Sequence, residues 1–214
     1  MLPMVLDVAR LRLILVGNGA AAERRLTLLD EAGAANLTVY ADDPAPALAR
    51  AAAGRLVRRL PSAQELAAAR VVFVAERGAR HARDLAATAR AAGALVHVED
   101  EPAHSDLHAP ATLRRGDLTI AVSTGGQSPA LAVQVKRFLG ALFGTEWQRR
   151  LDELAALRHG WREGGADSET VVRWTEEWVG RQGWLPTTGV ADREPVLDAG
   201  HYAAALDAAV ASRH

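Results

Sequence analysis

Short hydrophobic runs alternate with segments of helical periodicity along the first half of the chain. The runs carry few polar positions, which is typical of strands buried on both faces of a sheet. The segments between them place apolar residues at helical spacing, as Ala22, Leu26 and Leu29 show. This alternation predicts an α/β fold with a Rossmann-type parallel sheet. The expected strands are 11–16, 37–41, 55–60, 70–75 and 94–98, and the expected helices are 20–32, 45–53, a short one after Ser62, and 80–92.

The pattern changes after Asp100. Two further runs flank Gly116-Asp117, a dipeptide that favours the tight turn of a β-hairpin. All five tryptophans lie beyond this point, so we expect a helical subdomain whose rings fill a small core or an oligomer interface. The expected segments are hairpin strands at 111–115 and 118–123, helices at 130–142, from 146 onward and at 199–211, and loops at 160–167 and 186–195. The predicted divisions are a Rossmann domain at 1–110, a hairpin-containing middle region at 111–144 and a helical C-terminal subdomain at 145–214.

A glycine-rich turn follows the first expected strand. Gly17-Asn18-Gly19-Ala20-Ala21-Ala22 has the pattern G-x-G-x-x-A between a strand and a helix. In this setting Gly17 permits the tight turn, Gly19 lets the backbone approach a pyrophosphate, and Ala22 lets helix and strand pack closely. The start of the helix adds N–H groups and a partial positive charge. The pattern predicts a dinucleotide site, and an ordinary corner with small residues is the alternative.

Two acidic residues end the second expected strand. Asp42 lies 20 residues after Ala22, where an acid can bond the ribose 2′-hydroxyl and repel a 2′-phosphate. Asp43 is the neighbouring alternative. The pair favours NAD over NADP as the cofactor.

Composition excludes several classes of protein. The 25 basic and 26 acidic residues nearly cancel, so we expect neither nucleic acid nor an anionic membrane as a partner. The absence of cysteine excludes disulfides, thiolate catalysis and cysteine-bound metals. No apolar run reaches the ~18 residues of a membrane span, and the first residues lack a basic start, so we expect a cytoplasmic protein without a signal peptide. Lys136 is the one lysine, so an anionic ligand would be held by arginine.

Several motifs occur in an order and spacing that resemble the precorrin-2 dehydrogenase and sirohydrochlorin ferrochelatase family. This family includes the N-terminal part of siroheme synthase. The resemblance covers about residues 2–150, and its most specific part is the V-S-T-G-G-x-S-P-A-L-A segment. The motifs are Leu2-Pro3-Met4, Ala22-Glu23-Arg24-Arg25 within the fingerprint region, Val98-Glu99-Asp100-Glu101-Pro102, and the segment from Ala121 to Ala132.

The resemblance implies a reaction and an assembly. Family members oxidise precorrin-2 to sirohydrochlorin with NAD⁺, and many also insert Fe²⁺ to give siroheme. They are homodimers that associate through the middle region, and the tetrapyrrole lies beside the nicotinamide. Two alternatives are a non-catalytic NAD-binding regulatory module and a chelatase or tetrapyrrole-binding protein that has lost hydride transfer.

Asp100 matches the essential aspartate of the family, and the resemblance implies that it is the base. Two further considerations agree with that role. Loss of a hydride must be matched by loss of a proton, and the carboxyl end of a parallel strand faces the crevice where cofactors bind. A turn residue before Pro102 is the structural alternative.

The glycine-rich loop that follows the hairpin matches the segment near the tetrapyrrole in the family. Its glycines can present N–H groups to a carboxylate, whereas Ser128 is expected first as the cap of the next helix. Arginines nearby could bind the carboxylates of the substrate or remain solvated. The expected substrate-binding residues are Ser123, Thr124, Gly125, Gly126, Ser128, Arg114 and Arg115, with Arg137 as a further candidate.

Three positions depart from the pattern of the family. Glu76 lies where relatives carry an A-T-[DN] motif, His97 replaces an asparagine, and Leu107 replaces a phenylalanine. The histidines allow another hypothesis, in which His97, Asp100, His104 and His108 hand a divalent metal to the macrocycle. In the alternative, His97 faces the interior and the other two histidines lie on a solvated loop. No firm metal site is predicted.

Overall fold

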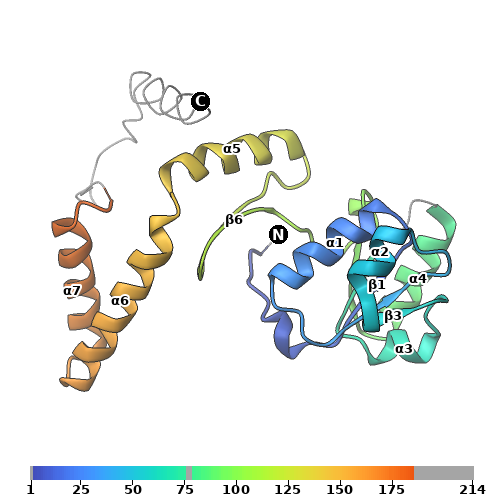
Figure 1. Ribbon diagram of the computed structural model, residues 1–214, viewed down its shortest axis with the longest axis horizontal. Helices are drawn as coiled ribbons and strands as arrows, with labels where there is room; N and C mark the ends of the chain where they lie inside the picture. The colour runs from blue at the N-terminus through green and yellow to red at the C-terminus, as the bar shows by residue number, and fades with distance from the viewer. Residues whose placement is uncertain (1, 76–78, 186–214) are drawn as a thin grey trace. The chain divides into compact units, whose positions relative to one another are not determined.

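The computed structural model describes residues 2–75 and 79–185 (Figure 1). The chain divides into two compact units, Met1–Ala109 and Pro110–His214. The loop at Glu76 and the segments expected at 186–195 and 199–211 lie outside the described residues. The further division expected at residue 144 stays a prediction.

Five parallel strands form the sheet of the first unit. They lie in the order β3-β2-β1-β4-β5, which is the order of the first five strands in a Rossmann fold. Leu13 of the central strand pairs with Leu37 on one side and with Val71 on the other. The strands are β1 (Leu13–Val16), β2 (Leu37–Tyr40), β3 (Leu56–Val57), β4 (Val71–Val74) and β5 (Leu95–Val98).

Helices cover both faces of this sheet. Leu26 of α1 and Leu48 of α2 pack with Leu15 in one core, while Leu66 of α3 packs with Val72 in the other. The predicted α/β fold with a Rossmann-type parallel sheet is therefore confirmed. The helices are α1 (Ala20–Glu31), α2 (Pro46–Ala52), α3 (Ala63–Ala68) and α4 (Ala79–Ala91), with short 3₁₀ helices η1 (Val8–Arg10), η2 (Ala53–Arg55) and η3 (Pro102–His104).

The second unit begins with the predicted hairpin. Strands β6 (Ala111–Arg115) and β7 (Leu118–Val122) are antiparallel, and Gly116 between them has φ +60°. Three helices follow among the residues up to 185, α5 (Pro129–Leu142), α6 (Glu146–Glu163) and α7 (Ser168–Arg181).

Helix α6 continues through part of the expected 160–167 loop, so that prediction was wrong for residues 160–163. The helix ends instead at a Schellman motif, in which Gly165 has φ +87°. The Gly165 N–H bonds the Arg162 carbonyl, and the Ala166 N–H bonds the Trp161 carbonyl. The left-handed Gly165 therefore marks the end of the helix, whereas Gly160, where the loop was expected to begin, lies within it.

Tryptophan rings pack against one another in the second unit. Trp161 and Trp174 meet edge to face with centroids 5.6 Å apart, and Trp147 and Trp184 do so at 6.4 Å. The Arg150 guanidinium lies within 5.5 Å of both rings of the second pair. The rings therefore pack in two pairs, while Trp174 remains 37% exposed, and the choice between a small core and an oligomer interface stays a prediction.

Within the described part of the chain, we find no helix whose length and hydrophobicity would suffice for a membrane span.

Candidate functional site

The corner between β1 and α1 depends on close packing at Gly17. A Cβ at this position would lie 2.7 Å from the Ala75 carbonyl oxygen and 3.0 Å from the Ala22 Cβ. Neither neighbour can move freely, since one belongs to the backbone and the other to the first turn of α1. Gly17 and Ala22 therefore have the packing roles that the fingerprint predicts.

Gly19 has a different environment. It caps α1, and a Cβ there would meet no protein atom within 4 Å. The Glu23 N–H makes the first helical bond, to the Gly19 carbonyl, so the N–H groups of residues 20–22 come before the first donor that bonds within the helix. Protein packing therefore leaves space at Gly19 for a ligand, and helix-start N–H groups are available beside it.

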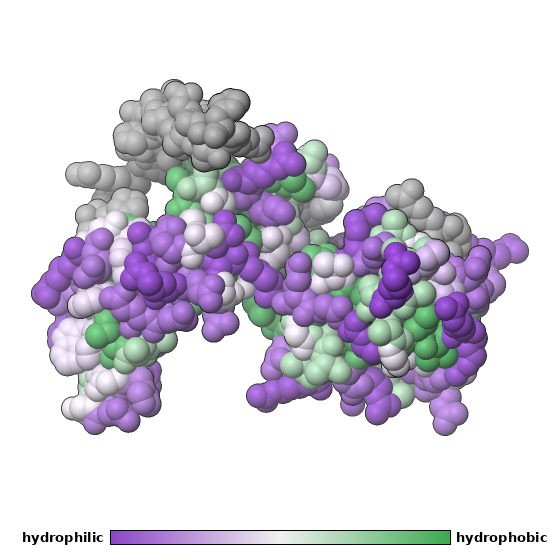
Figure 2. All heavy atoms as spheres, in the orientation of Figure 1, coloured by the Kyte–Doolittle hydropathy of each residue, from purple (hydrophilic) through white to green (hydrophobic). Residues whose placement is uncertain are grey.

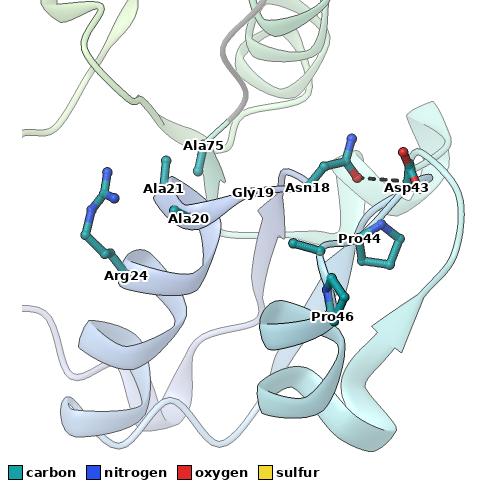
Figure 3. A pocket seen from close by; sticks show the side chains of 10 residues that line it. Asn18, Gly19, Ala20, Ala21, Arg24, Asp43, Pro44, Pro46 and Ala75 are labelled. Carbon is teal, nitrogen blue, oxygen red and sulfur yellow. Dashed lines mark hydrogen bonds between the residues drawn. The ribbon is translucent and has the colours of Figure 1, made fainter.

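A cleft of about 720 Å³ lies against this corner (Figure 3). Its volume lies within the range of small-molecule sites. Gly17 and Asp42 are not among the lining residues, although they adjoin them. The lining consists of Asn18, Gly19, Ala20, Ala21, Arg24, Asp43, Pro44, Ala45, Pro46 and Ala75.

Asn18 joins the glycine-rich turn to the acidic end of β2. Its Nδ2 donates to Asp42 Oδ1 at 2.7 Å, and its Oδ1 accepts from the Asp43 N–H at 3.1 Å. The Asn18 hydrogen bond and a backbone hydrogen bond lower the pKa of Asp42 from its usual value. Asp42 is thus held as an anion, while Asp43 lines the cleft.

Arg24 is a cleft residue that the sequence analysis did not assign. Figure 3 shows it on one side of the cleft, with Asp43 on the other. Its position four residues after Ala20 places it on the same helix face as the start of α1. This spacing could have identified it as a cation near the pyrophosphate.

Asp100 is exposed in a turn at the carboxyl end of β5. The turn is closed by a hydrogen bond from the Glu101 N–H to the Val98 carbonyl. Asp100 has φ +59°, a conformation that aspartate and asparagine tolerate better than most side chains. Because β1 and β5 are parallel strands of one sheet, the Asp100 turn and the glycine-rich turn lie at the same edge.

A charged cluster of two buried residues and one half-buried residue lies beside this turn. Arg25, 8% exposed, donates through one nitrogen to Glu99 Oε2 at 2.7 Å and to His97 Nε2 at 2.9 Å. The Arg25 guanidinium also lies 5.6 Å from the centroid of the Phe73 ring. His97 and the Arg25 guanidinium lower the pKa of Glu99 to about 2. Glu99 is therefore an anion at neutral pH.

The histidine hypothesis is not supported. His97 faces the interior, and its Nδ1 lies 3.0 Å from the Leu107 carbonyl while Nε2 contacts Arg25. Both ring nitrogens are occupied, so His97 has no lone pair to offer a metal. Over residues 2–75 and 79–185, no group of three His, Asp or Glu side chains could hold a metal ion.

The glycine-rich loop of the second unit is folded by its own hydroxyl groups. Ser128 accepts a hydrogen bond from the Leu131 N–H and caps α5, which confirms its expected capping role. Thr124 Oγ1 accepts from the Ser128 N–H, and Ser123 Oγ accepts from the Gly125 N–H. Gly125 and Gly126 are exposed in left-handed conformations, with φ of +65° and +85°.

Arg115 is a correction among the expected substrate residues. Its Nε donates to the Phe143 carbonyl at 2.8 Å, and its two terminal nitrogens donate to the carbonyls of Gly140 and Arg114. The guanidinium thus satisfies carbonyls at the C-terminal end of α5, which the helix itself cannot do. Arg114 and Arg137 are exposed.

Comparisons with known proteins agree with this arrangement. A family model described as putative NAD(P)-binding matches residues 4–111. A second model, described as sirohaem biosynthesis protein central, matches residues 115–142. The chain belongs to the putative NAD(P)-binding family. The resemblance found in the sequence is confirmed, and so is the class of cofactor.

Siroheme synthases are similar to the chain over about two thirds of its length. The protein from Chromobacterium violaceum is 35% identical over 150 residues, which are 69% of this chain and 32% of that protein. The one from Pseudomonas putida strain W619 is 37% identical over 149 residues, which are 68% of this chain and 31% of that protein. The chain therefore spans about a third of the length of these curated relatives.

A solved structure shows the same fold. The structure titled "SirC, precorrin-2 dehydrogenase" matches with a TM-score of 0.70 at 20% sequence identity. The match covers 99% of this chain and 100% of the other.

Alanine at Gly17 and alanine at Gly19 should have opposite effects, the first on stability and the second on NAD⁺ affinity. Gly17→Ala should lower the free energy of unfolding by at least about 1–3 kcal/mol, because the new Cβ overlaps the backbone. Gly19→Ala should leave stability within about 0.5 kcal/mol but weaken NAD⁺ binding at least tenfold, because its Cβ enters the space for the pyrophosphate. Thermal unfolding and calorimetric titration with NAD⁺ measure both effects. If Gly19→Ala binds NAD⁺ with unchanged affinity, the pyrophosphate does not bind at this corner.

Proposed function

We propose that this protein oxidises precorrin-2 to sirohydrochlorin with NAD⁺. One hydrogen leaves the substrate as a hydride and another as a proton, so the products are sirohydrochlorin, NADH and H⁺. The observation that supports the proposal most strongly is an exposed carboxylate, Asp100, at the sheet edge that carries the dinucleotide fingerprint. A base beside a hydride acceptor is what this reaction requires.

The residues of the cleft fit a dinucleotide. The N–H groups of residues 20–22 and the Arg24 guanidinium would bind the pyrophosphate, since both supply positive charge. Asp43, supported by the Asn18–Asp42 pair, would bond the ribose hydroxyls and repel a 2′-phosphate. NAD⁺, when bound, supplies the hydride acceptor at its nicotinamide ring.

Asp100 would take the proton that leaves the substrate. The carboxylate is exposed, so it can reach a ligand, and the closed turn limits its movement. If Fe²⁺ is a second substrate, as the family resemblance implies, the same carboxylate would accept protons displaced from the macrocycle nitrogens.

Binding of the tetrapyrrole is assigned to the second unit. Its glycine-rich loop offers the backbone N–H of the exposed Gly126, since the Gly125 N–H already donates to Ser123 Oγ. Arg114 and Arg137 offer exposed guanidinium groups for carboxylates. Arg115 is left out because it caps α5.

A homodimer is part of the proposal. Hydrophobic residues interrupt the hydrophilic surface of the second unit in Figure 2. Leu131, Leu142 and Val172 are 48–57% exposed, and a homodimer interface would cover such side chains.

The acidic pair predicts the choice of cofactor. Asp43→Ser removes the charge that faces the cleft, so the preference for NAD⁺ over NADP⁺ should fall about tenfold, a change of ~1.4 kcal/mol. The dissociation constants of both dinucleotides give this ratio. Glu31→Gln, at the far end of α1 and also exposed, is the control and should leave the ratio unchanged. An unaltered ratio in Asp43→Ser would assign the discrimination to other residues.

The base is tested by Asp100→Asn under anaerobic conditions. Purified protein is mixed with enzymatically generated precorrin-2 and NAD⁺, and NADH absorbance is followed. The variant should lose about 10²–10⁴-fold in kcat. Its NAD⁺ affinity and thermal stability should stay near those of the wild type, since asparagine tolerates the left-handed backbone.

Two outcomes would contradict this account. If Asp100→Asn turns over precorrin-2 as fast as the wild type, Asp100 is not the base. Wild-type protein that binds NAD⁺ but forms no sirohydrochlorin would contradict the proposed reaction and favour a non-catalytic NAD-binding module.

A further inference from the structure

A cluster of the buried Arg25 and His97 with the half-buried Glu99 connects two functional segments of the first unit. Arg25 lies on α1, whose first turn adjoins the cleft, and Glu99 precedes Asp100 in the turn after β5. These elements are separated by more than 70 residues in sequence, yet one Arg25 nitrogen bonds both His97 and Glu99. We name these three residues the α1–β5 cluster.

Glu99 is held from two sides. Its N–H donates to the Val74 carbonyl at 2.9 Å, and its side chain accepts the bond from Arg25 at 2.7 Å. Glu99 and Asp100 are the two central residues of the turn that the Glu101 N–H closes. With Glu99 fixed and Asp100 in a left-handed conformation, the turn has little freedom to change the direction of the Asp100 side chain.

His97 extends the cluster toward the segment that leaves the first unit. His97 Nδ1 lies 3.0 Å from the Leu107 carbonyl oxygen, and Nε2 lies 2.9 Å from the Arg25 nitrogen and 3.5 Å from Glu99 Oε2. The ring also lies beside Phe73 on β4, with centroids 6.0 Å apart. The cluster thus contacts α1, β4, β5 and the chain after η3.

Stability alone does not explain this cluster. Removing a charged pair from water costs free energy that the mutual attraction often fails to recover, and apolar residues of similar volume can replace such pairs without loss. Arg25 Nε adds to the cost, since it is buried and no acceptor for it is found among the described residues. Several directional hydrogen bonds from one guanidinium fix the relative positions of the groups that they join, which an apolar contact does not do.

We propose that the α1–β5 cluster positions Asp100 relative to the dinucleotide, so that Arg25 and Glu99 are positioning residues for proton removal. This inference rests on the proposed function. Through the cluster, the helix that receives the pyrophosphate and the turn that carries the base move as one body. A displacement of ~1 Å at a reacting group can cost about 100-fold in rate, so the effect belongs in kcat.

The test compares Glu99→Gln with wild-type protein. The substitution keeps the volume of the side chain and removes its charge. We expect kcat for precorrin-2 oxidation to fall about 10- to 100-fold, while KM for NAD⁺ changes less than about threefold. Arg25→Met, which removes the bonds from the other side, should show the same split between kcat and KM. If Arg25→Met does not fold, Glu99→Gln decides the matter alone.

Arg55→Met is the matched control. Arg55 also forms an ion pair with α1, through Asp30, but does not contact the Asp100 turn. This variant loses one arginine–carboxylate pair and should keep the kcat of the wild type.

A second readout is independent of turnover. In the protein without added cofactor, amide hydrogen exchange at Glu101 should accelerate about tenfold in Glu99→Gln and remain unchanged in Arg55→Met, because the cluster holds the turn that this amide closes. Equal kcat in Glu99→Gln and Arg55→Met would overturn the proposal. A loss of kcat in Glu99→Gln without faster exchange at the Glu101 amide would also overturn it, because Glu99 would then affect kcat without holding the turn. Wild-type protein without turnover would contradict the proposed function, and the exchange result would still decide whether the cluster holds the turn.

Discussion

The close approach at Gly17 is the constraint on which the first unit depends. The backbone of Ala75 and the Cβ of Ala22 leave no room for a side chain there, so α1 starts directly at the end of β1. This start leaves helix-terminal N–H groups beside an open Gly19. The same tight packing brings α1 against β4, where the Arg25 side chain reaches Phe73 and the end of β5. One steric requirement thus shapes the cofactor cleft and allows the α1–β5 cluster.

Parallel strand order explains why the proposed chemistry gathers at one edge. With β1 central, β4 next to it and β5 beyond β4, the glycine-rich turn, Asn18 and Asp100 all follow carboxyl ends of strands. Asn18 connects this edge to β2, and Arg25 connects it to β5. The sheet places these turns near one another, and hydrogen bonds of the Asn18 and Arg25 side chains then connect them. The proposed reaction needs both a hydride acceptor and a base, and these bonds fix the segments that would supply them.

Local patterns predicted much of this structure. Short apolar runs, the G-x-G-x-x-A turn and Gly116-Asp117 each depend on neighbouring residues, so strands, fingerprint and hairpin could be found from the sequence. Contacts between distant residues could not. Arg115 looked like a substrate ligand until α5 placed its last carbonyls beside the guanidinium. His97 looked like a metal ligand until α1 brought Arg25 to its Nε2. In both cases the hydrogen-bond partner comes from a distant part of the sequence, so the spacing of neighbouring residues could not predict it.

The most direct test of the central claim is the stoichiometry of the reaction under anaerobic conditions. Purified wild-type protein, precorrin-2 and excess NAD⁺ are incubated, and sirohydrochlorin and NADH are quantified in the same sample by their absorbance. The account predicts one NADH for each sirohydrochlorin formed, because one hydride and one proton leave each substrate molecule. Sirohydrochlorin formed without NADH, or no sirohydrochlorin from protein that binds NAD⁺, would contradict it.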